Sequence, residues 1–176
     1  KIEMNLKSIT TIFLDVDGIF TDGSLYYSDD GRNFIKFNVY DGLGCILLKE
    51  VGVEILVLTA RNSNAVIRRF KELGINKIFT KILKKREFII EYSKSHNLKK
   101  QELAMMGDDL QDLVVKDVVG HFFTTPNAIK IVKDSADFVT ERSGGNGAVR
   151  EICDLIIRSK GSAATKEFDL YIENKC

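Results

Sequence analysis

Short apolar runs and segments with helical spacing alternate along the whole chain. Residues 11–16 (TIFLDV) form a nearly continuous run of branched, aliphatic and aromatic side chains, which is typical of a strand covered on both faces. This alternation predicts βαβ units and an α/β fold with a mainly parallel sheet. The other predicted strands cover residues 53–59, 77–80, 103–106, 121–124 and 138–139, and the predicted helices cover residues 42–51, 62–73, 84–95, 110–118, 126–133 and 148–158.

Two further apolar segments, residues 25–27 and 34–39, break this alternation. The polar residues 28–33 (SDDGRN) between them form a strong turn signal, so we expect a β-hairpin over about residues 25–39. A hairpin directly after the first strand is not part of a plain doubly wound fold. We therefore expect a small appendage near the end of the sheet that carries the site.

Composition limits the class of protein. The 176 residues, 44% of them hydrophobic, suit one domain, which we place at residues 1–160, followed by a C-terminal tail at residues 161–176. The 26 basic and 25 acidic side chains leave a net charge of +1, which argues against a nucleic-acid binder. No segment approaches the length of an apolar membrane span, so we expect no membrane contact.

The cysteines and the two ends of the chain indicate a cytoplasmic protein. Cys45, Cys153 and Cys176 match no zinc spacing and cannot all pair, so we expect two small buried side chains and a terminal thiol. This fits a reducing compartment, and residues 1–8 lack the apolar run of a secretory signal. For the tail we expect a frayed end, with docking onto a neighbouring subunit as the alternative.

Acidic and hydroxyl side chains stand where three predicted strands end. In open parallel sheets, sites form outside the carboxyl ends of the strands, so these groups converge if the strands are neighbours. Carboxylates at that range repel one another unless a cation lies among them, and all-oxygen ligands favour Mg²⁺. The side chains are Asp15 and Asp17 after the first strand, Thr59 and Arg61 after the second core strand, and Asp108, Asp109 and Asp112 after the strand at residues 103–106.

These residue types suit phosphate chemistry. Asp15 and Asp17 can take different roles because the chain turns there: one attacks, and the other gives and later accepts a proton. Gly18 leaves the backbone unobstructed, so amides near Asp17 can meet phosphate oxygens. The Thr59 hydroxyl and the charge of Lys85 suit phosphate oxygens as well.

Plainer interpretations stay open for several of these residues. Lys85 lies within the run KKR at residues 84–86, which by itself favours a solvated helix start. Asp41 can cap the helix that follows it, and Asp112 is explained as well by capping or exposure as by a ligand role. We expect the glycine-rich loop at residues 143–147 to be flexible.

Four motifs in the expected order resemble those of the haloacid dehalogenase (HAD) superfamily of phosphotransferases. They are residues 15–23 (DVDGIFTDG), Thr59, Lys85 and residues 107–112 (GDDLQD). Together they are far more specific than any one alone. Residues 37–44 (FNVYDGLG) and 144–151 (GGNGAVRE) narrow the resemblance to the capless branch typified by 3-deoxy-D-manno-octulosonate 8-phosphate (KDO 8-phosphate) phosphatase.

This resemblance implies a HAD-type Rossmann-like three-layer αβα domain without a large cap. It implies that Asp15 is the nucleophile that forms an aspartyl-phosphate, and that Asp17 is the general acid and then the general base. Mg²⁺ would be held by Asp15, the main-chain carbonyl of Asp17, and Asp108, with Asp109 and Asp112 in support.

The resemblance also implies how the substrate is held. Thr59, Arg61 and Lys85 would contact it together with Asp17. Members of this branch are typically homotetramers in which the hairpin of one subunit helps to close the site of the next.

The chain departs from the family pattern at several positions. Ala60 stands where the family usually has Gly, which is tolerable unless the backbone needs a positive φ. Tyr40 stands where the branch usually has an arginine that is thought to help with the acidic sugar. Lys81 is one candidate for the missing charge, and Arg142 and Arg150 beside the glycine-rich loop are others.

We therefore expect a Mg²⁺-dependent phosphomonoester hydrolase that acts on a phosphorylated acidic sugar. KDO 8-phosphate, from the biosynthesis of a lipopolysaccharide sugar, is the first candidate. A sialic-acid-like nonulosonate 9-phosphate fits the same motifs and remains an alternative. An alternative from another class is a non-hydrolytic, receiver-like phospho-acceptor module, although such a domain lacks both the Asp-x-Asp-Gly step and the hairpin.

Overall fold

The computed structural model describes residues 5–161 of the chain. Strands and helices alternate, as the apolar pattern predicts. In chain order the elements are β1 (Thr11–Leu14), β2 (Tyr26–Tyr27), β3 (Asn33–Phe34), α1 (Val39–Glu50), β4 (Glu54–Leu58), α2 (Asn64–Glu72), β5 (Ile78–Phe79), α3 (Lys85–Ser95), β6 (Leu103–Met106), α4 (Leu110–Leu113), β7 (His121–Thr124), α5 (Lys130–Ser135), β8 (Phe138–Val139) and α6 (Ala148–Ser159), with short 3-10 helices at Leu6–Ser8 and Lys100–Glu102.

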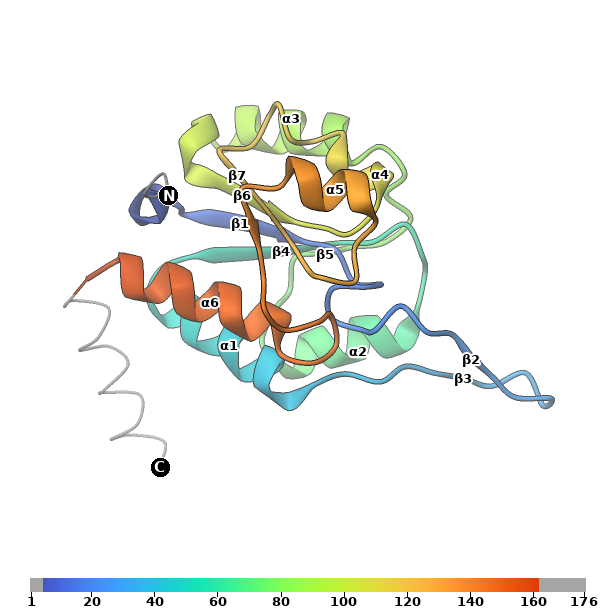
Figure 1. Cartoon of the computed structure of the whole chain (residues 1–176). Helices are drawn as coiled ribbons and strands as arrows, with labels where there is room; N and C mark the ends of the chain where they lie inside the picture. Colours follow the sequence, from blue (N-terminus) through green and yellow to red (C-terminus); the bar gives the residue numbers. More distant parts are fainter. Residues whose placement is uncertain (1–4, 162–176) are drawn as a thin grey trace, which may run out of the picture.

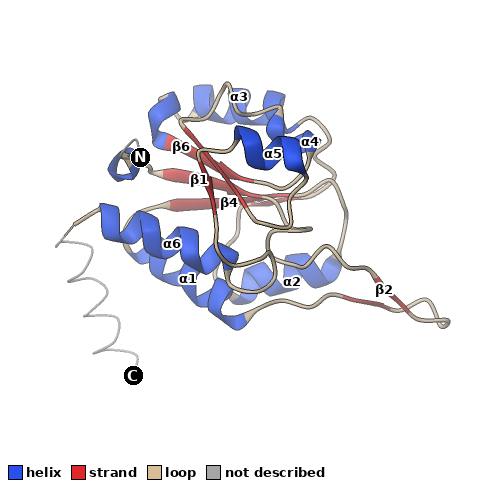
Figure 2. Cartoon of the chain, in the orientation of Figure 1, coloured by secondary structure: helices blue, strands red, loops and turns tan. Residues whose placement is uncertain are grey.

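A six-stranded parallel sheet lies between two layers of helices (Figure 1). The strand order is β5-β4-β1-β6-β7-β8, and each neighbouring pair is parallel. Helices α1, α2 and α6 cover one face, and α3, α4 and α5 cover the other (Figure 2). The predicted three-layer α/β fold is therefore confirmed.

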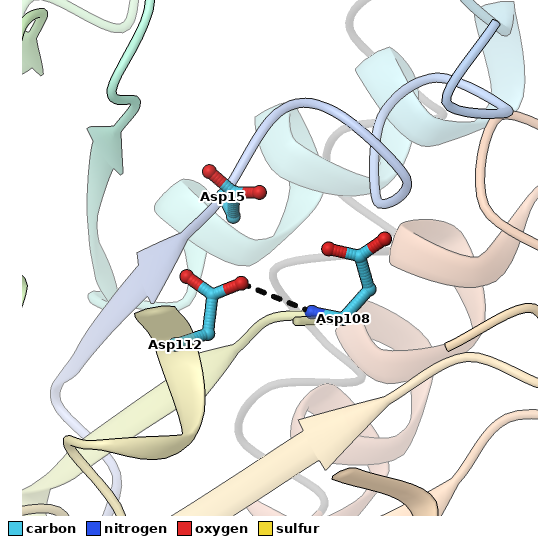
Figure 3. Close-up of side chains that lie close together, drawn as sticks. All are labelled: Asp15, Asp108 and Asp112. Carbon is cyan, nitrogen blue, oxygen red and sulfur yellow. Dashed lines mark hydrogen bonds between the residues drawn. The ribbon is translucent and has the colours of Figure 1, made fainter. Parts of the chain in front are cut away.

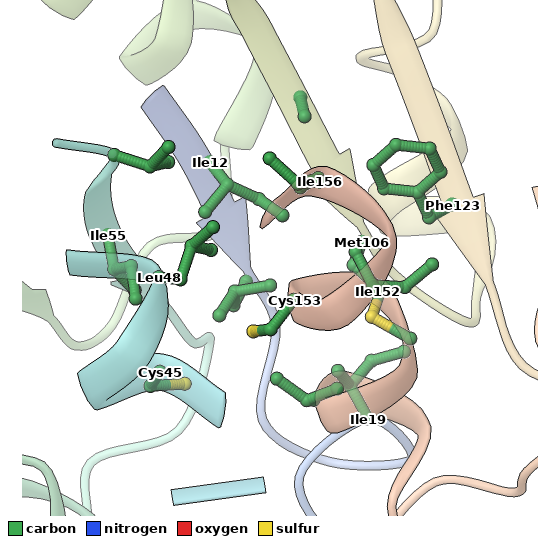
Figure 4. Packing of buried hydrophobic residues seen from close by; sticks show 14 of the residues in the cluster. Ile12, Ile19, Cys45, Leu48, Ile55, Met106, Phe123, Ile152, Cys153 and Ile156 are labelled. Atoms are coloured by element: carbon green, nitrogen blue, oxygen red, sulfur yellow. The ribbon is translucent and has the colours of Figure 1, made fainter. Parts of the chain in front are cut away.

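The central strands are apolar on both faces because both faces are covered. On β1, Ile12 and Leu14 join the core under α1, α2 and α6, whereas Phe13 joins the core under α3. Neighbouring strands divide their side chains in the same alternating way, since successive side chains of a strand point to opposite faces. Figure 4 shows the first of these cores, with Cys45 from α1 and Cys153 from α6 among its members.

Two helices are shorter than the apolar pattern predicts. Helix α4 ends at Leu113 rather than near residue 118, because residues 114–118 continue as turns. Val115 is still buried within these turns, so the apolar spacing of this segment reflects burial and not helical structure. Helix α5 begins at Lys130 rather than at residue 126, and residues 126–129 form a turn that serves the site described below.

The predicted hairpin is present, and it projects away from the body of the domain (Figure 1). Strands β2 and β3 pair antiparallel, with Tyr26 opposite Phe34, but the ladder is shorter than predicted because it stops at two residues per strand. Within residues 5–161 this hairpin is the insertion after β1, and no larger cap domain accompanies it.

The cysteines agree with expectation where they are described. Cys45 and Cys153 are buried free thiols, whereas Cys176 and the tail from residue 162 onward lie outside the described residues. The boundary between a domain at residues 1–160 and a tail remains a prediction. In the part of the chain that the structure describes, no helix has both the length and the apolar character needed to cross a bilayer.

Candidate active site

The ends of three adjacent strands form the site. Leu14, the last residue of β1, pairs with Val57 on β4 and with Met106 on β6. The next residue, Asp15, donates its backbone N–H to the Met106 carbonyl over 3.1 Å. Because β4, β1 and β6 are neighbours, residues that are far apart in sequence leave the sheet at one place, as predicted from the strand ends.

Three carboxylates meet at this place. Asp15, Asp108 and Asp112 each offer one oxygen, and these oxygens all lie within 4.8 Å of one another (Figure 3). Asp112 also accepts hydrogen bonds from the backbone N–H groups of Asp108, at 3.1 Å, and Asp109, at 3.4 Å. The alternative that Asp112 is exposed is wrong, since its side chain is completely buried. Asp109 stays outside the group and caps α4 by accepting from the Leu110 N–H.

Lys85 lies beside these carboxylates. Its ammonium is 2.7 Å from Asp15 Oδ1 and 2.5 Å from Asp112 Oδ1, and its side chain is 0% exposed. The interpretation of the KKR run as a solvated helix start is therefore wrong for Lys85. Burial works against the charge of Lys85, but the nearby charges of Asp15 and Asp112 outweigh it and raise its pKa above the usual value.

Without a cation, the carboxylates are in an unfavourable environment. Burial, and then the negative charge of Asp112, raises the pKa of Asp15 to about 7, although Lys85 opposes the shift. Burial and the charges of Asp112 and Asp109 raise the pKa of Asp108 to about 7. A bound divalent cation would relieve this repulsion, and three oxygen donors at this spacing fit a hard ion such as Mg²⁺.

Asp17 and Arg61 lie at the mouth of the site. Arg61 Nη1 is 3.3 Å from Asp17 Oδ1, and both side chains are more than a third exposed. They help to line a hollow of about 260 Å³ between the base of the hairpin and the start of α2. Thr59 is buried at the end of β4, where its hydroxyl accepts from the Arg61 N–H over 3.2 Å. The side chain of Asp17 thus faces the hollow and Arg61, apart from the three grouped carboxylates.

Gly18 has a role in the structure that the sequence did not predict. Its N–H is not left for phosphate oxygens, because it donates to the hydroxyl of Thr21 over 3.3 Å. A Cβ at Gly18 would lie 1.8 Å from Asp108 Oδ2, and its φ is +79°. Glycine is therefore needed so that the first turn can approach the carboxylate of the fourth motif. Sequence reasoning missed Thr21, although it lies within the first motif.

Asp41 does not cap its own helix, contrary to one of the predictions. Asn38 caps α1 by accepting from the Tyr40 N–H. Asp41 is fully buried and accepts from the N–H groups of Gly147, at 3.2 Å, and Arg150, at 2.9 Å. It thereby joins α1 to the start of α6, and no sequence pattern indicates so distant a partner.

The glycine-rich loop is anchored rather than flexible. Gly144 donates its N–H to Asn127 Oδ1 over 2.8 Å, and Gly145 donates to the Ile19 carbonyl over 3.0 Å. The loop is therefore bound to the turn that carries Asp17.

The residues that depart from the family pattern, and the arginines considered in their place, lie at different positions in the structure. Tyr40, Arg142 and Arg150 line a second, open hollow of about 710 Å³, whose lining does not include Asp17 or Arg61. Arg150 is also engaged by Asp154 at 2.8 Å. The structure thus does not bring these arginines to the predicted site.

The other two departures lie in the backbone near the site. Ala60 needs no positive φ, so the prediction that its methyl is tolerated is confirmed. Lys81 adopts a φ of +60°, a conformation that favours glycine. The following residue, Ile82, donates its N–H to the Thr59 carbonyl, which places this turn next to the end of β4.

Comparison with known proteins agrees with this geometry. Residues 74–152 match the haloacid dehalogenase-like hydrolase family. The 3-deoxy-D-manno-octulosonate 8-phosphate phosphatase KdsC of Haemophilus influenzae is 33% identical over 162 residues, which cover 92% of this chain and 90% of that protein. The Escherichia coli K12 phosphatase of the same name is 32% identical over 155 residues, which cover 88% of this chain and 82% of that protein.

Solved structures lead to the same family. The 3-deoxy-D-manno-octulosonate 8-phosphate phosphatase of Moraxella catarrhalis, in complex with magnesium, phosphate and KDO, has a TM-score of 0.87 at 35% identity, covering 97% of this chain and 95% of that one. The cobalt-bound Haemophilus influenzae phosphatase has a TM-score of 0.85 at 33% identity, covering 93% of this chain and 98% of that one. These relatives favour an enzyme over a phospho-acceptor module. The chain belongs to the 3-deoxy-D-manno-octulosonate 8-phosphate phosphatase family of HAD hydrolases.

Proposed function

We propose that this protein is a Mg²⁺-dependent phosphatase that releases phosphate from KDO 8-phosphate, in the biosynthesis of a lipopolysaccharide sugar. The observation that carries this proposal is the convergence of Asp15, Asp108 and Asp112 beside the buried ammonium of Lys85. The proposal is supported by relatives named for this activity and by one relative that binds magnesium, phosphate and KDO together.

The proposed metal ligands are Asp15, Asp108 and the main-chain carbonyl of Asp17. Asp112 supports these ligands: it forms an ion pair with Lys85 and accepts hydrogen bonds from backbone N–H groups of the fourth motif. Mg²⁺ at this place would offset the negative charge of the phosphate and of the carboxylates during the reaction.

The proposed reaction has two displacements. Asp15 attacks phosphorus, the bond from phosphorus to the sugar oxygen breaks, and that oxygen takes a proton from Asp17. Water then attacks the aspartyl-phosphate, gives a proton to Asp17 and releases phosphate and free Asp15. The half-exposed position of Asp17 at the mouth of the hollow suits exchange of protons with a leaving group and with water.

Two cationic or polar groups would hold the phosphoryl oxygens. Lys85 is fixed by its two ion pairs, and the Thr59 hydroxyl lies at the end of the neighbouring strand. Arg61 lines the hollow and would contact the substrate there. These groups are oriented before the substrate arrives, so they can stabilise the transition state with little reorganisation.

Tyr40 is the reason to test a second sugar phosphate as the substrate. The residue stands where an arginine is usual, and it lies on the other hollow with Arg142. A sialic-acid-like nonulosonate 9-phosphate would use the same phosphate chemistry with a different sugar. Side-by-side kcat/KM values for the two sugar phosphates decide between them, and a higher value for the 9-phosphate would overturn the KDO assignment.

The test of the reaction is phosphate release from a panel of sugar phosphates with and without Mg²⁺. We expect release from KDO 8-phosphate that stops on addition of EDTA. Asp15→Asn should lower kcat by at least about 1,000-fold, as expected for loss of a nucleophile. Asp117→Asn, at an exposed ion pair with Arg86, is the matched control and should leave kcat unchanged. Substantial turnover by Asp15→Asn would show that Asp15 is not the nucleophile.

We further propose a homotetramer in which the hairpin of one subunit helps to close the site of the next. The hairpin exposes large apolar side chains, with Tyr26 at 46%, Tyr27 at 74% and Phe34 at 57%. Such a cluster is costly in water and typical of a surface that another chain covers. A cytoplasmic location is the corresponding proposal for the compartment, supported by the free thiols of Cys45 and Cys153.

A further inference from the structure

The turn between β7 and α5 contacts both loops that carry the proposed metal ligands. Asn127 Nδ2 donates to the Gly18 carbonyl over 3.1 Å, one residue beyond Asp17. Two residues later, the N–H of Ile129 donates to the Asp108 carbonyl over 3.3 Å. A turn of a few residues thus spans the first and fourth motifs.

Asn127 also contacts a third segment. Its Oδ1 accepts from the Gly144 N–H over 2.8 Å, so one amide side chain joins the first motif to the glycine-rich loop. The approach is close, since a Cβ at Gly144 would lie 1.8 Å from the Gly18 carbonyl oxygen. Both polar atoms of the Asn127 side chain are therefore used to hold backbone, although the residue itself lies at the surface.

Displacement of the Gly18 backbone would directly disturb the grouped carboxylates. Gly18 lies against the Asp108 carboxylate, so closely that a Cβ would overlap it. A change in the orientation of the Gly18 peptide would therefore change the distance between the Asp108 carboxylate and the turn that carries Asp17. The sheet ladder ends with β1 at Leu14, and the ion pairs of Asp15 with Lys85 and of Asp17 with Arg61 hold side chains rather than the Gly18 peptide.

We propose that Asn127 is a positioning residue, which holds the turn carrying Asp15 and Asp17 against Asp108 by joining the Gly18 carbonyl to the Gly144 amide. The proposal rests on the proposed function for its kinetic consequences. It does not make Asn127 a catalytic residue, since Asn127 is not part of the lining of the hollow beside Asp17. Loss of its side chain should therefore act on kcat and on metal binding more than on KM.

The first test compares three variants in Mg²⁺-dependent phosphate release. Asn127→Ala should lower kcat by about 10-fold or more and leave KM within about twofold, in line with the cost of losing outer partners of a metal site. Asn127→Asp keeps an acceptor for the Gly144 amide and should restore part of the lost rate. Asn146→Ala, at an exposed position in the glycine-rich loop, is the control and should match the wild type.

The second test does not depend on turnover. Hydrogen–deuterium exchange of the amides of residues 16–23 should be faster in Asn127→Ala than in the wild type. Calorimetric titration with Mg²⁺ alone should give a dissociation constant about 10-fold weaker for this variant. The melting temperature should change little, because Asn127 is at the surface and its truncation leaves no core cavity.

The outcomes separate this proposal from the proposed function. If Asn127→Ala has the same exchange rates, Mg²⁺ affinity and kcat as the wild type, the proposed role of Asn127 is overturned. This holds whatever the substrate proves to be. If the wild type releases phosphate from no sugar phosphate in the panel, the proposed function fails. Exchange and Mg²⁺ titration would then still decide the positioning role.

Discussion

Burial determines the chemistry of Asp15 and Lys85. Each would be an ordinary charged side chain in water, but here the two are shut into one small volume with Asp112. One cation faces two buried carboxylates, and Asp108 adds a third nearby. When its carboxyls are ionised, the group therefore carries excess negative charge, which a divalent ion can neutralise.

The raised pKa values predict a pH-dependent response to metal. With the pKa of Asp15 and Asp108 raised to about 7 from 3.8, the folded, metal-free chain holds protons that the unfolded chain has released. The free energy of unfolding in EDTA should therefore be highest below about pH 4 as far as these groups are concerned, and fall as pH rises to about 7.

Mg²⁺ competes with those protons, so its stabilising effect should increase with pH over the same range. The rise in melting temperature on addition of Mg²⁺, measured at pH 5.5 and pH 8, checks this, and we expect the larger rise at pH 8. Asp108→Asn removes one of the titrating carboxyls and should weaken the pH dependence. An equal Mg²⁺ effect at both pH values would contradict the assigned cluster.

Helices α1 and α6 are joined by a buried carboxylate as well as by apolar packing. Asp41, in the first turn of α1, accepts two backbone N–H groups at the start of α6, where Gly147 precedes the first helical residue. A helix N-terminus is electropositive and has unpaired donors, so a carboxylate stabilises it. Burial nevertheless raises the pKa of Asp41, which shows that desolvation works against its charge.

Asp41→Ala should lower the free energy of unfolding by about 1–3 kcal/mol, because it leaves buried amide donors without an acceptor. Urea unfolding measures the difference. Asp154→Ala, which removes an i,i+4 ion pair on α6, is the matched control and should cost less than about 1 kcal/mol. A cost for Asp41→Ala as small as that of the control would show that solvent satisfies the α6 amides.

At the scale of the whole molecule, residues 5–161 form a sheet covered by helices and a hairpin that projects from it. Both faces of the sheet are buried under helices (Figure 2). The hairpin stands apart with short strands, and a two-stranded ribbon of this kind is marginal by itself. Its exposed aromatic side chains are the support for the proposed contact with a second chain.

Tyr27→Lys combined with Phe34→Lys should convert the proposed tetramer into smaller species, as measured by sedimentation velocity. Both side chains are exposed in the single chain, so the melting temperature of the subunit should change little. Val114→Lys with Ile131→Lys replaces exposed apolar side chains on α5 and after α4 and should leave the assembly intact. Unchanged sedimentation of the hairpin variant would contradict the proposed interface.

The sequence by itself determined the order of strands and helices along the chain, whereas the ends of several of them differ in the structure. Apolar runs such as residues 11–16 can be recognised locally because burial of a strand leaves a local pattern, and the position of Asp15 near the end of this run follows from it. The same reasoning misjudged the residues after Leu113, because burial without helix produces a similar pattern. The motif spacing was likewise sufficient to indicate the family.

Only the tertiary structure decided what each polar side chain contacts. The burial of Lys85, the pairing of Asp41 with α6 and the two bonds of Asn127 all join segments far apart in the chain. Hydrogen bonds and ion pairs act over a few ångströms in space, and no periodicity along the chain encodes distant partners. The strand order of the sheet brings these segments together, and the local pattern does not contain that order.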